Sequence, residues 1–225
     1  MSRKIYGIFV AGGSGTRMGG DIPKQFLSLG GVPVLERTIA RFVEAVPDIT
    51  VVTVLPPAHI RTWKEMCLTR SFFQPQIIIE GGITRYHSVR NALEAVPDGA
   101  TVLVQDGVRP LGSVSLIRSI VERAGTCRAV IPAVPVTDTL KWKDGTLPDP
   151  DRSRLAAVQT PQAFRSEDLR QAYTQPYDPA FTDDASVVAR KNIPLTLVEG
   201  ERYNIKITVP EDIPLAEFII SACNP

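Results

Sequence analysis

The stretch that decides the fold is Ile5-Tyr-Gly-Ile-Phe-Val10 followed by Ala11-Gly-Gly-Ser-Gly-Thr-Arg17-Met-Gly-Gly-Asp-Ile-Pro23-Lys24-Gln25-Phe26. The short apolar run from Ile5 to Val10 predicts a buried strand. Glycines let the next segment approach a ligand closely, and its successive backbone N–H groups can form an anion-binding nest. Arg17 and Lys24 add positive charge beside that nest. The combination indicates an α/β protein with a site for a triphosphate.

Three other glycine motifs do not fit this loop. A Walker A sequence is absent, Met18 stands where a dinucleotide fingerprint needs its last glycine, and Thr16 replaces the final glycine of a lipase elbow. A plain glycine-rich turn with solvated cations remains the alternative to a phosphate site.

Outward from this loop, strand-like and helix-like patterns alternate. This alternation predicts a Rossmann-like three-layer α/β sandwich with a mainly parallel mixed sheet and ligands beyond the carboxyl ends of its strands. The predicted strands lie at 50–55, 76–79, 101–105 and 129–134, and the predicted helices cover 35–46, 58–69, 89–96 and 114–124.

The pattern breaks at about 135–158. Residues 137–142 and 153–158 predict two extended segments around a turn at 143–145, which together form a β-arm that projects from the sheet. Such an arm cannot bury both faces alone, so a partner subunit in a homodimer is its simplest cover. The chain otherwise predicts a single domain over residues 1–225.

The end of the chain carries one further helix signal. Thr208-Val-Pro-Glu211 has the spacing of a capping box, with threonine as N-cap and glutamate three residues later. We therefore predict a final helix that begins here and ends near Ala222.

Composition excludes several classes of protein. The net charge of +1 disfavours a nucleic-acid partner, which usually needs a basic stripe. Cys67, Cys127 and Cys223 are widely spaced and predict free thiols in a reducing compartment. With only His59 and His87, a histidine-based metal site or a Ser-His-Asp triad is disfavoured. No apolar run approaches a membrane span, and the start does not fit a signal peptide, so we expect a cytoplasmic protein without a membrane partner.

The glycine loop resembles the signature of nucleotidyltransferases that activate sugars and polyol phosphates. The order of the other motifs is similar, over nearly the whole chain, to the 2-C-methyl-D-erythritol 4-phosphate cytidylyltransferase family of non-mevalonate isoprenoid biosynthesis. The motifs are Gly81-Gly-Ile-Thr-Arg-Tyr-His-Ser-Val89, Asp106-Gly-Val-Arg-Pro110, Pro135-Val-Thr-Asp-Thr139, Thr160-Pro-Gln162, Thr182-Asp-Asp-Ala-Ser186 and Asn204-Ile-Lys-Ile-Thr208.

The resemblance implies an activity. An enzyme of this family transfers CMP from CTP to 2-C-methyl-D-erythritol 4-phosphate, giving 4-diphosphocytidyl-2-C-methyl-D-erythritol and pyrophosphate. It also implies Mg²⁺ as cofactor, held mainly by the CTP phosphates, with no protein residue assigned as its ligand. From residue chemistry alone we would assign Asp106 to Mg²⁺, and that alternative stays open.

The resemblance further implies which residues act on the phosphates. Arg17 and Lys24 would stabilise the transition state, and Arg152 and Lys206 would position the acceptor for attack. Preorganised cations suit this work because attack on phosphorus spreads negative charge over its oxygens. Lys24 as an ordinary surface lysine is the alternative for that residue. Arg154 carries the same charge two residues from Arg152 and remains an alternative to it.

Residues of both substrate sites follow by the same resemblance. Gly82 and Ser88 would read the cytosine, although Ser88 can instead stabilise its helix. Arg109 would contact the acceptor phosphate, with a structural role in its loop as the alternative. Thr139 and Arg152 would reach the acceptor across a dimer. The implied nucleotide site is Ala11, Gly12, Gly13, Gly15, Gly82, Ser88, Asp106 and Gly107, and the implied acceptor site is Asp106, Arg109, Thr139, Arg152, Thr160, Thr182 and Lys206.

Two other functions stay open. Gly12, Ser14 and Thr16 bring the loop closer to ribitol-5-phosphate cytidylyltransferases, whereas 135–141 and 182–186 favour the methylerythritol enzymes. A nucleotide-binding module without catalysis is the alternative of another class, which the presence of Arg17, Lys24 and Lys206 together disfavours.

Overall fold

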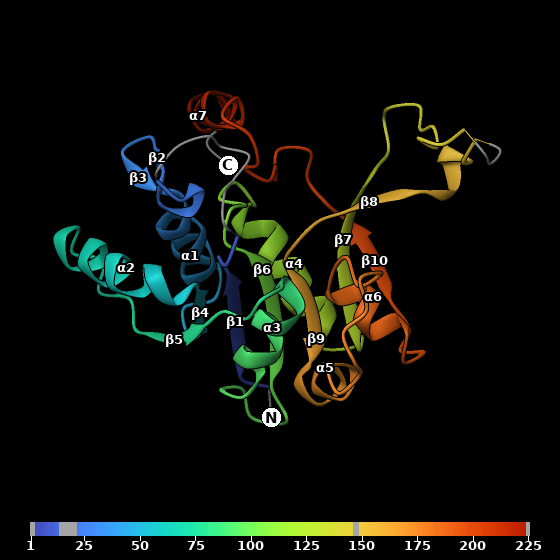
Figure 1. Ribbon diagram of the computed structural model, residues 1–225, viewed down its shortest axis with the longest axis horizontal. Helices are drawn as coiled ribbons and strands as arrows, with labels where there is room; N and C mark the ends of the chain where they lie inside the picture. Colours follow the sequence, from blue (N-terminus) through green and yellow to red (C-terminus); the bar gives the residue numbers. More distant parts are fainter. Residues whose placement is uncertain (1–2, 14–21, 146–148, 224–225) are drawn as a thin grey trace.

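The strand predicted at Ile5–Val10 is β1, near the middle of the main sheet in a computed structural model that describes residues 3–13, 22–145 and 149–223 (Figure 1). The described strands run in the order β10-β7-β9-β6-β1-β4-β5, with β8 paired to β7. Neighbours are parallel except at β9, which is antiparallel to β6 and β7, and at β8. The other strands of this sheet are β4 (Thr50–Leu55), β5 (Gln76–Glu80), β6 (Thr101–Asp106), β7 (Ala129–Pro135), β8 (Ala156–Val158), β9 (Gln162–Arg165) and β10 (Thr196–Glu199).

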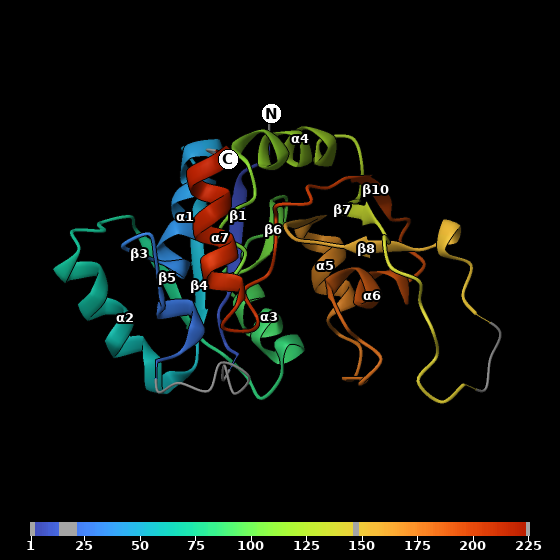
Figure 2. The same cartoon turned by 90° about the horizontal axis from the view of Figure 1, so that it is seen from above.

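Helices cover both faces of this sheet (Figure 2). One apolar core packs α1 (Val34–Ala45), α2 (Pro57–Thr69) and α4 (Val114–Ala124) against one face. A second core packs α3 (Arg85–Leu93), α5 (Ser166–Ala172) and α6 (Asp184–Ala189) against the other. The predicted Rossmann-like three-layer sandwich with a mainly parallel mixed sheet is therefore confirmed.

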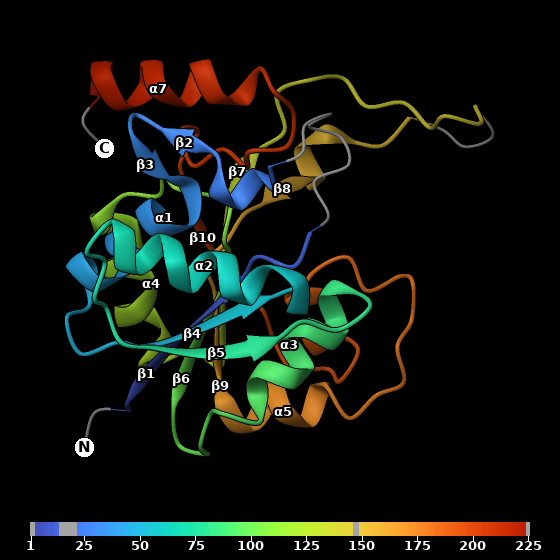
Figure 3. The ribbon, with the colours of Figure 1, turned by 60° about the vertical axis from the view of Figure 1, so that its left-hand side comes forward.

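A third apolar core lies outside the main sheet. It joins α7 (Asp212–Cys223) to the short antiparallel ribbon of β2 (Ser28–Leu29) and β3 (Val32–Pro33), and Figure 3 shows them side by side. The predicted capping box at Thr208–Glu211 is wrong. The Asp212 carboxylate accepts from the backbone N–H groups of Thr208 and Val209, at 2.6 and 2.9 Å, and the Thr208 hydroxyl donates to the same carboxylate.

The projecting arm leaves the sheet after β7 and returns at β8 (Figures 1 and 3). The segment predicted to be extended at 137–142 forms no β-strand among the described residues. The segment predicted at 153–158 is extended only at β8, since Arg152–Arg154 forms a short 3-10 helix. Leu140 and Trp142 on the arm remain 38% and 48% exposed.

The carboxyl ends of the central strands gather the loops that matter for function. Val10 at the end of β1 pairs with Asp106 at the end of β6 and with Val54 on β4. Backbone hydrogen bonds from Ala11 to Val54 and from Gly107 to Val10 extend this edge by one residue on each strand. The loops after β1 and β6 therefore start from fixed points at one end of the sheet. No helix in the described ranges is long and apolar enough to cross a membrane.

Candidate active site

A cleft of about 400 Å³ opens at the carboxyl end of β1. We call it the glycine-loop cleft. Most of the predicted nucleotide and phosphate residues line it, namely Ala11, Gly12, Gly13, Lys24, Gly82, Ser88, Asp106 and Lys206. Gly107 lies beside its floor, where an added Cβ would sit 3.1 Å from the Ala11 Cβ. Arg17 and Gly15 were also predicted here, and they fall outside the described residues.

Gly82 and Ser88 form one unit at the rim of this cleft. A Cβ on Gly82 would lie 2.3 Å from the His87 Cβ, so the α3 backbone leaves no room for any side chain at this position. The Ser88 hydroxyl accepts from the Gly82 N–H at 3.1 Å and donates to the Thr84 carbonyl at 2.9 Å. Ser88 therefore links the Gly82 turn to the first turn of α3, and its hydroxyl keeps one lone pair for a ligand.

Lys24 reaches the cleft from a short 3-10 helix, Lys24–Phe26. Its neighbours fix that helix, because Phe26 is buried and Gln25 donates to the Ala11 carbonyl at 3.0 Å. The Lys24 ammonium group donates to the Ile207 carbonyl at 3.2 Å. This hydrogen bond joins residues 183 positions apart in the chain and holds the Lys24 ammonium group at the cleft. An ordinary surface lysine would not be held in this way.

Asp106 lies at the centre of a cluster of cations. Its carboxylate is 2.9 Å from the Lys206 ammonium group and 3.4 Å from the guanidinium groups of Arg85 and Arg109. Burial alone would raise the pKa of Asp106, but the charges of these three partners outweigh it and hold that pKa well below its usual range. The carboxylate is therefore ionised over the whole physiological pH range.

Arg85 was given no role from the sequence, yet it links two carboxylates. Its Nη2 donates to Asp184 at 2.7 Å and its Nε points at Asp106 at 3.4 Å. Burial would lower the pKa of Arg85, but the two carboxylates raise it above its ordinary value. The only sequence signal for Arg85 was its place in the Gly81–Val89 motif. Its partner Asp184 lies 99 residues away in the chain, so the motif could not indicate this contact.

A second cavity, of about 480 Å³, meets the glycine-loop cleft at Arg85, Asp106 and Lys206. We call it the acceptor cavity. Five of the predicted acceptor residues line it, namely Asp106, Arg109, Thr160, Thr182 and Lys206. Because the two cavities share their boundary residues, ligands in both would meet beside Asp106 and Lys206.

Thr160 and Arg109 also hold the protein together around this boundary. The Thr160 hydroxyl accepts from the Asp106 backbone N–H at 3.1 Å, and its carbonyl accepts from Asn204 at 2.9 Å. Arg109 donates to the Asn204 carbonyl at 2.7 Å. Arg109 thus stabilises its own loop, which is the structural role considered above as the alternative for this residue. Its side chain also lines the acceptor cavity.

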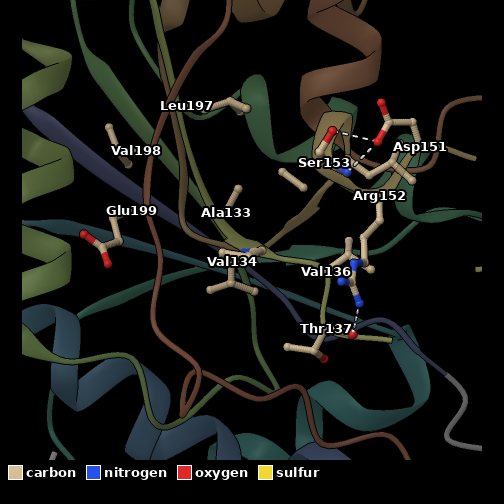
Figure 4. A pocket seen from close by; sticks show the side chains of 13 residues that line it. Ala133, Val134, Val136, Thr137, Asp151, Arg152, Ser153, Leu197, Val198 and Glu199 are labelled. Carbon is tan, nitrogen blue, oxygen red and sulfur yellow. Dashed lines mark hydrogen bonds between the residues drawn. The ribbon is translucent and has the colours of Figure 1, made fainter. Parts of the chain in front are cut away.

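The arm residues do not join this site within one chain. Arg152 lines a separate pocket of about 1020 Å³ at the base of the arm, and it donates to the Thr137 carbonyl at 2.6 Å (Figure 4). Thr139 and Arg154 are exposed, and neither lines the glycine-loop cleft or the acceptor cavity. The predicted roles of Thr139 and Arg152 therefore depend on a second chain.

The acidic residues at the glycine-loop cleft determine how the protein could hold a divalent cation there. Within the described ranges, no three His, Cys, Asp or Glu side chains group as a metal cage. The glycine-loop cleft supplies Asp106, which is already surrounded by cations. This donor set fits an ion carried mainly by phosphate oxygens better than one held by protein ligands alone.

Two solved structures of similar fold are named for the same enzyme activity. The 4-diphosphocytidyl-2C-methyl-D-erythritol synthase of Anaerococcus prevotii superposes with a TM-score of 0.83 at 27% identity, covering 98% of this chain and 100% of that one. The 2-C-methyl-D-erythritol 4-phosphate cytidylyltransferase of Thermus thermophilus gives 0.74 at 32% identity, with 99% and 100% covered.

Sequence relatives agree with these structures. A protein of Porphyromonas gingivalis named 2-C-methyl-D-erythritol 4-phosphate cytidylyltransferase is 47% identical over 225 residues, which cover 99% of this chain and 100% of the relative. One of Phocaeicola vulgatus with the same name is 46% identical, with 98% and 100% covered. The family model described as 2-C-methyl-D-erythritol 4-phosphate cytidylyltransferase matches residues 5–222. The chain belongs to this family of cytidylyltransferases.

Proposed function

We propose that this chain transfers CMP from CTP to 2-C-methyl-D-erythritol 4-phosphate in isoprenoid precursor biosynthesis, and releases pyrophosphate. The observation that carries the proposal is the meeting of two cavities at Asp106 and Lys206. One cavity has a glycine backbone and Lys24 for a triphosphate, and the other has hydroxyl groups and Arg109 for a small polyol phosphate. The names of the full-length relatives specify these two substrates.

The chemistry needs alignment and charge more than proton transfer. A phosphate monoester is already anionic near pH 7, so it can attack the α-phosphorus of CTP without a general base. The barrier comes from bringing two anions together, and fixed cations lower it by neutralising the charge that builds up. Lys24 and Arg17 would act on the triphosphate, and Lys206 would hold the acceptor phosphate in line.

Mg²⁺ is the cofactor that we propose for this reaction. Bound to the triphosphate, it would neutralise part of the phosphate charge and help the pyrophosphate to leave. Asp106 is the acidic residue that lines the glycine-loop cleft and could face such an ion, and Lys24 and Lys206 would bind phosphate oxygens.

We also propose a homodimer in which the arm completes the acceptor site of a second copy. The exposed Leu140 and Trp142 on the arm and Leu197 on the edge strand β10 support an apolar contact between copies. Thr139 and Arg152 would then reach the acceptor phosphate of the other copy, where the fork of an arginine can hold two phosphate oxygens.

The thiols of Cys67 and Cys127 are free, as suits a cytoplasmic location.

Mixed dimers test the shared site. Lys24→Ala and Arg152→Ala chains are each expected to lose most activity alone. Mixed chains are expected to regain activity, because some dimers then hold one site with both native residues. A mixture that stays as inactive as its components, or a wild type that sediments as a monomer at micromolar concentration, would refute the shared site.

The acceptor assay tests the function itself. The protein is incubated with CTP and Mg²⁺ and with 2-C-methyl-D-erythritol 4-phosphate, with ribitol 5-phosphate or with no acceptor, and pyrophosphate release is measured. We expect release with the methylerythritol phosphate at a kcat/KM far above that with ribitol phosphate. The reverse order would assign the ribitol enzyme, and binding of CTP without release in any sample would assign a non-catalytic module.

A further inference from the structure

Arg85 lies in the wall shared by the two cavities, and its guanidinium spans two carboxylates from opposite sides. Asp184 on α6 is fully buried and Asp106 ends β6. Arginine can make both contacts at once because its planar guanidinium carries separate N–H groups on Nε and Nη2 in a rigid fork. A lysine ammonium group is a single point charge and cannot span the two sites in this way.

Asp184 is held from several sides, so it is a rigid anchor. Its Oδ2 accepts from Arg85 at 2.7 Å, and its Oδ1 accepts from the Tyr173 hydroxyl at 2.6 Å. Gln162 on β9 accepts from the Ala185 N–H at 2.9 Å, which fixes the start of α6 to the sheet. Burial raises the pKa of Tyr173 well above its usual range, so its hydroxyl keeps its proton and donates.

Asp106 divides its two oxygens between different partners. Its Oδ1 faces Arg85, and its Oδ2 faces Lys206 at 2.9 Å and Arg109 at 3.4 Å. Contacts to both oxygens together orient this carboxylate, with Arg85 on the Oδ1 side and Lys206 and Arg109 on the Oδ2 side. The position of Lys206 at the junction of the cavities thus depends on a chain of contacts that begins inside the protein.

We propose that Asp184 and Arg85 are positioning residues for cytidylyl transfer. Asp184 holds Arg85, Arg85 orients Asp106, and Asp106 keeps Lys206 where the acceptor phosphate must lie. We call this the Asp184–Arg85 relay. The proposal rests on the proposed function. It gives a positioning role to two residues that need not touch either substrate.

The relay predicts a particular pattern of kinetic loss. Arg85→Lys keeps the positive charge but cannot span both carboxylates, and Asp184→Asn keeps the shape but removes the anchor's charge. Both variants are expected to lower kcat roughly 10- to 100-fold and to raise the KM for the acceptor, since small misplacements of reacting groups cost about this much. The Kd for CTP, measured by calorimetry, is expected to stay within about threefold of the wild type because the glycine backbone and Lys24 are untouched.

Arg128→Lys is the matched control. Arg128 also donates through Nε and Nη2, in this case to the two oxygens of one buried carboxylate, that of Asp168, and it lies just before β7, at the opposite end of the sheet from the cavities. This variant is expected to keep the wild-type kcat. A loss in Arg128→Lys equal to that in Arg85→Lys would show a general effect of weakened ion pairs and would overturn the relay.

A double variant that removes both charges tests whether the loss of kcat comes from misfolding. Arg85→Met combined with Asp184→Leu leaves neither partner of the pair alone in the interior, which is the costly situation. This chain is expected to unfold within a few degrees of the wild type and yet to show the same loss of kcat. A folded double variant with wild-type kcat would overturn the proposal.

Two further outcomes separate the relay from simpler accounts. Full kcat in Arg85→Lys would mean that charge alone suffices, and parallel losses of kcat, CTP affinity and thermal stability would mean a purely structural role; either result overturns the relay. An active wild type with an active Arg85→Lys chain refutes only the relay. An inactive wild type with both acceptors refutes the proposed function, and the relay with it.

Discussion

Gly82 shows how a single residue shapes the rim of the nucleotide site. The obstacle to a side chain there is space, since an added Cβ would overlap the His87 side chain at 2.3 Å and approach its carbonyl carbon to 3.0 Å. Ser88 then fixes the Gly82 N–H from the helix side. The rim therefore presents bare backbone to a ligand, held in one position by α3.

We predict that Gly82→Ala weakens CTP binding. The methyl group must push the 81–84 loop away from α3, and overpacking of this kind typically costs about 1–3 kcal/mol. Where that cost falls on the rim, the Kd for CTP rises roughly 10-fold, while the unfolding temperature changes by only a few degrees. Calorimetric titration with CTP checks this, and an unchanged Kd in a folded variant would show that the rim does not contact the nucleotide.

Sequence and structure agree best for residues that act through their own local motif. Gly82, Lys24, Asp106 and Lys206 were all predicted from motifs, and they line one cleft. Asp184 carried no role from the sequence, although it stood inside the Thr182–Ser186 motif. Its importance comes from a partner on α3, and a contact between distant segments leaves no periodic trace in either one.

At the scale of elements, long and regular patterns were predicted well. The strand at 50–55 and the helix at 114–124 were confirmed with the predicted bounds. No element was predicted between 159 and 207, where β9 and β10 have four residues each. Strands this short have too few residues to show a hydrophobic period. β9 also runs antiparallel to its neighbours, and the βα alternation of the sequence does not predict an antiparallel strand.

One ion pair fastens the start of the chain to α5. Arg3 donates to both oxygens of Glu167, at 2.6 and 2.9 Å, in the first turn of that helix. The hydrogen bonds from Arg3 lower the pKa of Glu167 to about 2 from its ordinary 4.5. Because the folded state favours the ionised form, this pair adds stability that is present above pH 4.5 and is lost as the pH falls towards 2.

We predict that Glu167→Gln lowers the free energy of unfolding at pH 7 by less than about 1 kcal/mol, since the pair is partly exposed. The difference from the wild type is expected to shrink as the pH falls from 4.5 towards 2, because the glutamate of the unfolded chain becomes protonated there while that of the folded protein stays ionised. Urea unfolding between pH 7 and pH 3 measures this, with the exposed Glu122→Gln as control. A difference that stays constant over that range, or that grows on acidification, would contradict the assignment.

The whole molecule brings distant parts of the chain to one end of the sheet. Lys24 comes from the segment after β1, Asp106 ends β6, and Lys206 precedes the last helix. A hydrogen bond from Lys24 to the Ile207 carbonyl joins the first of these segments to the last. The βα alternation predicted that loops would meet at this edge, whereas Lys206 of the C-terminal segment was predicted there only from the family resemblance.

The arm is the other feature that belongs to the whole molecule. The sequence predicted its position and its need for a partner, but not its irregular backbone. In the proposed homodimer, the arm would make its contacts with the second copy, so strand pairing within its own chain would not be needed.

The turnover of Lys24→Ala tests the central claim most directly, namely that fixed cations at this end of the sheet make two phosphates react. The account predicts that kcat for pyrophosphate release with CTP and 2-C-methyl-D-erythritol 4-phosphate falls roughly 10²–10³-fold, as for loss of one preorganised group. The Kd for CTP should change by less than about tenfold, because the glycine backbone still binds the nucleotide. A folded Lys24→Ala protein that keeps near-normal kcat would contradict the claim.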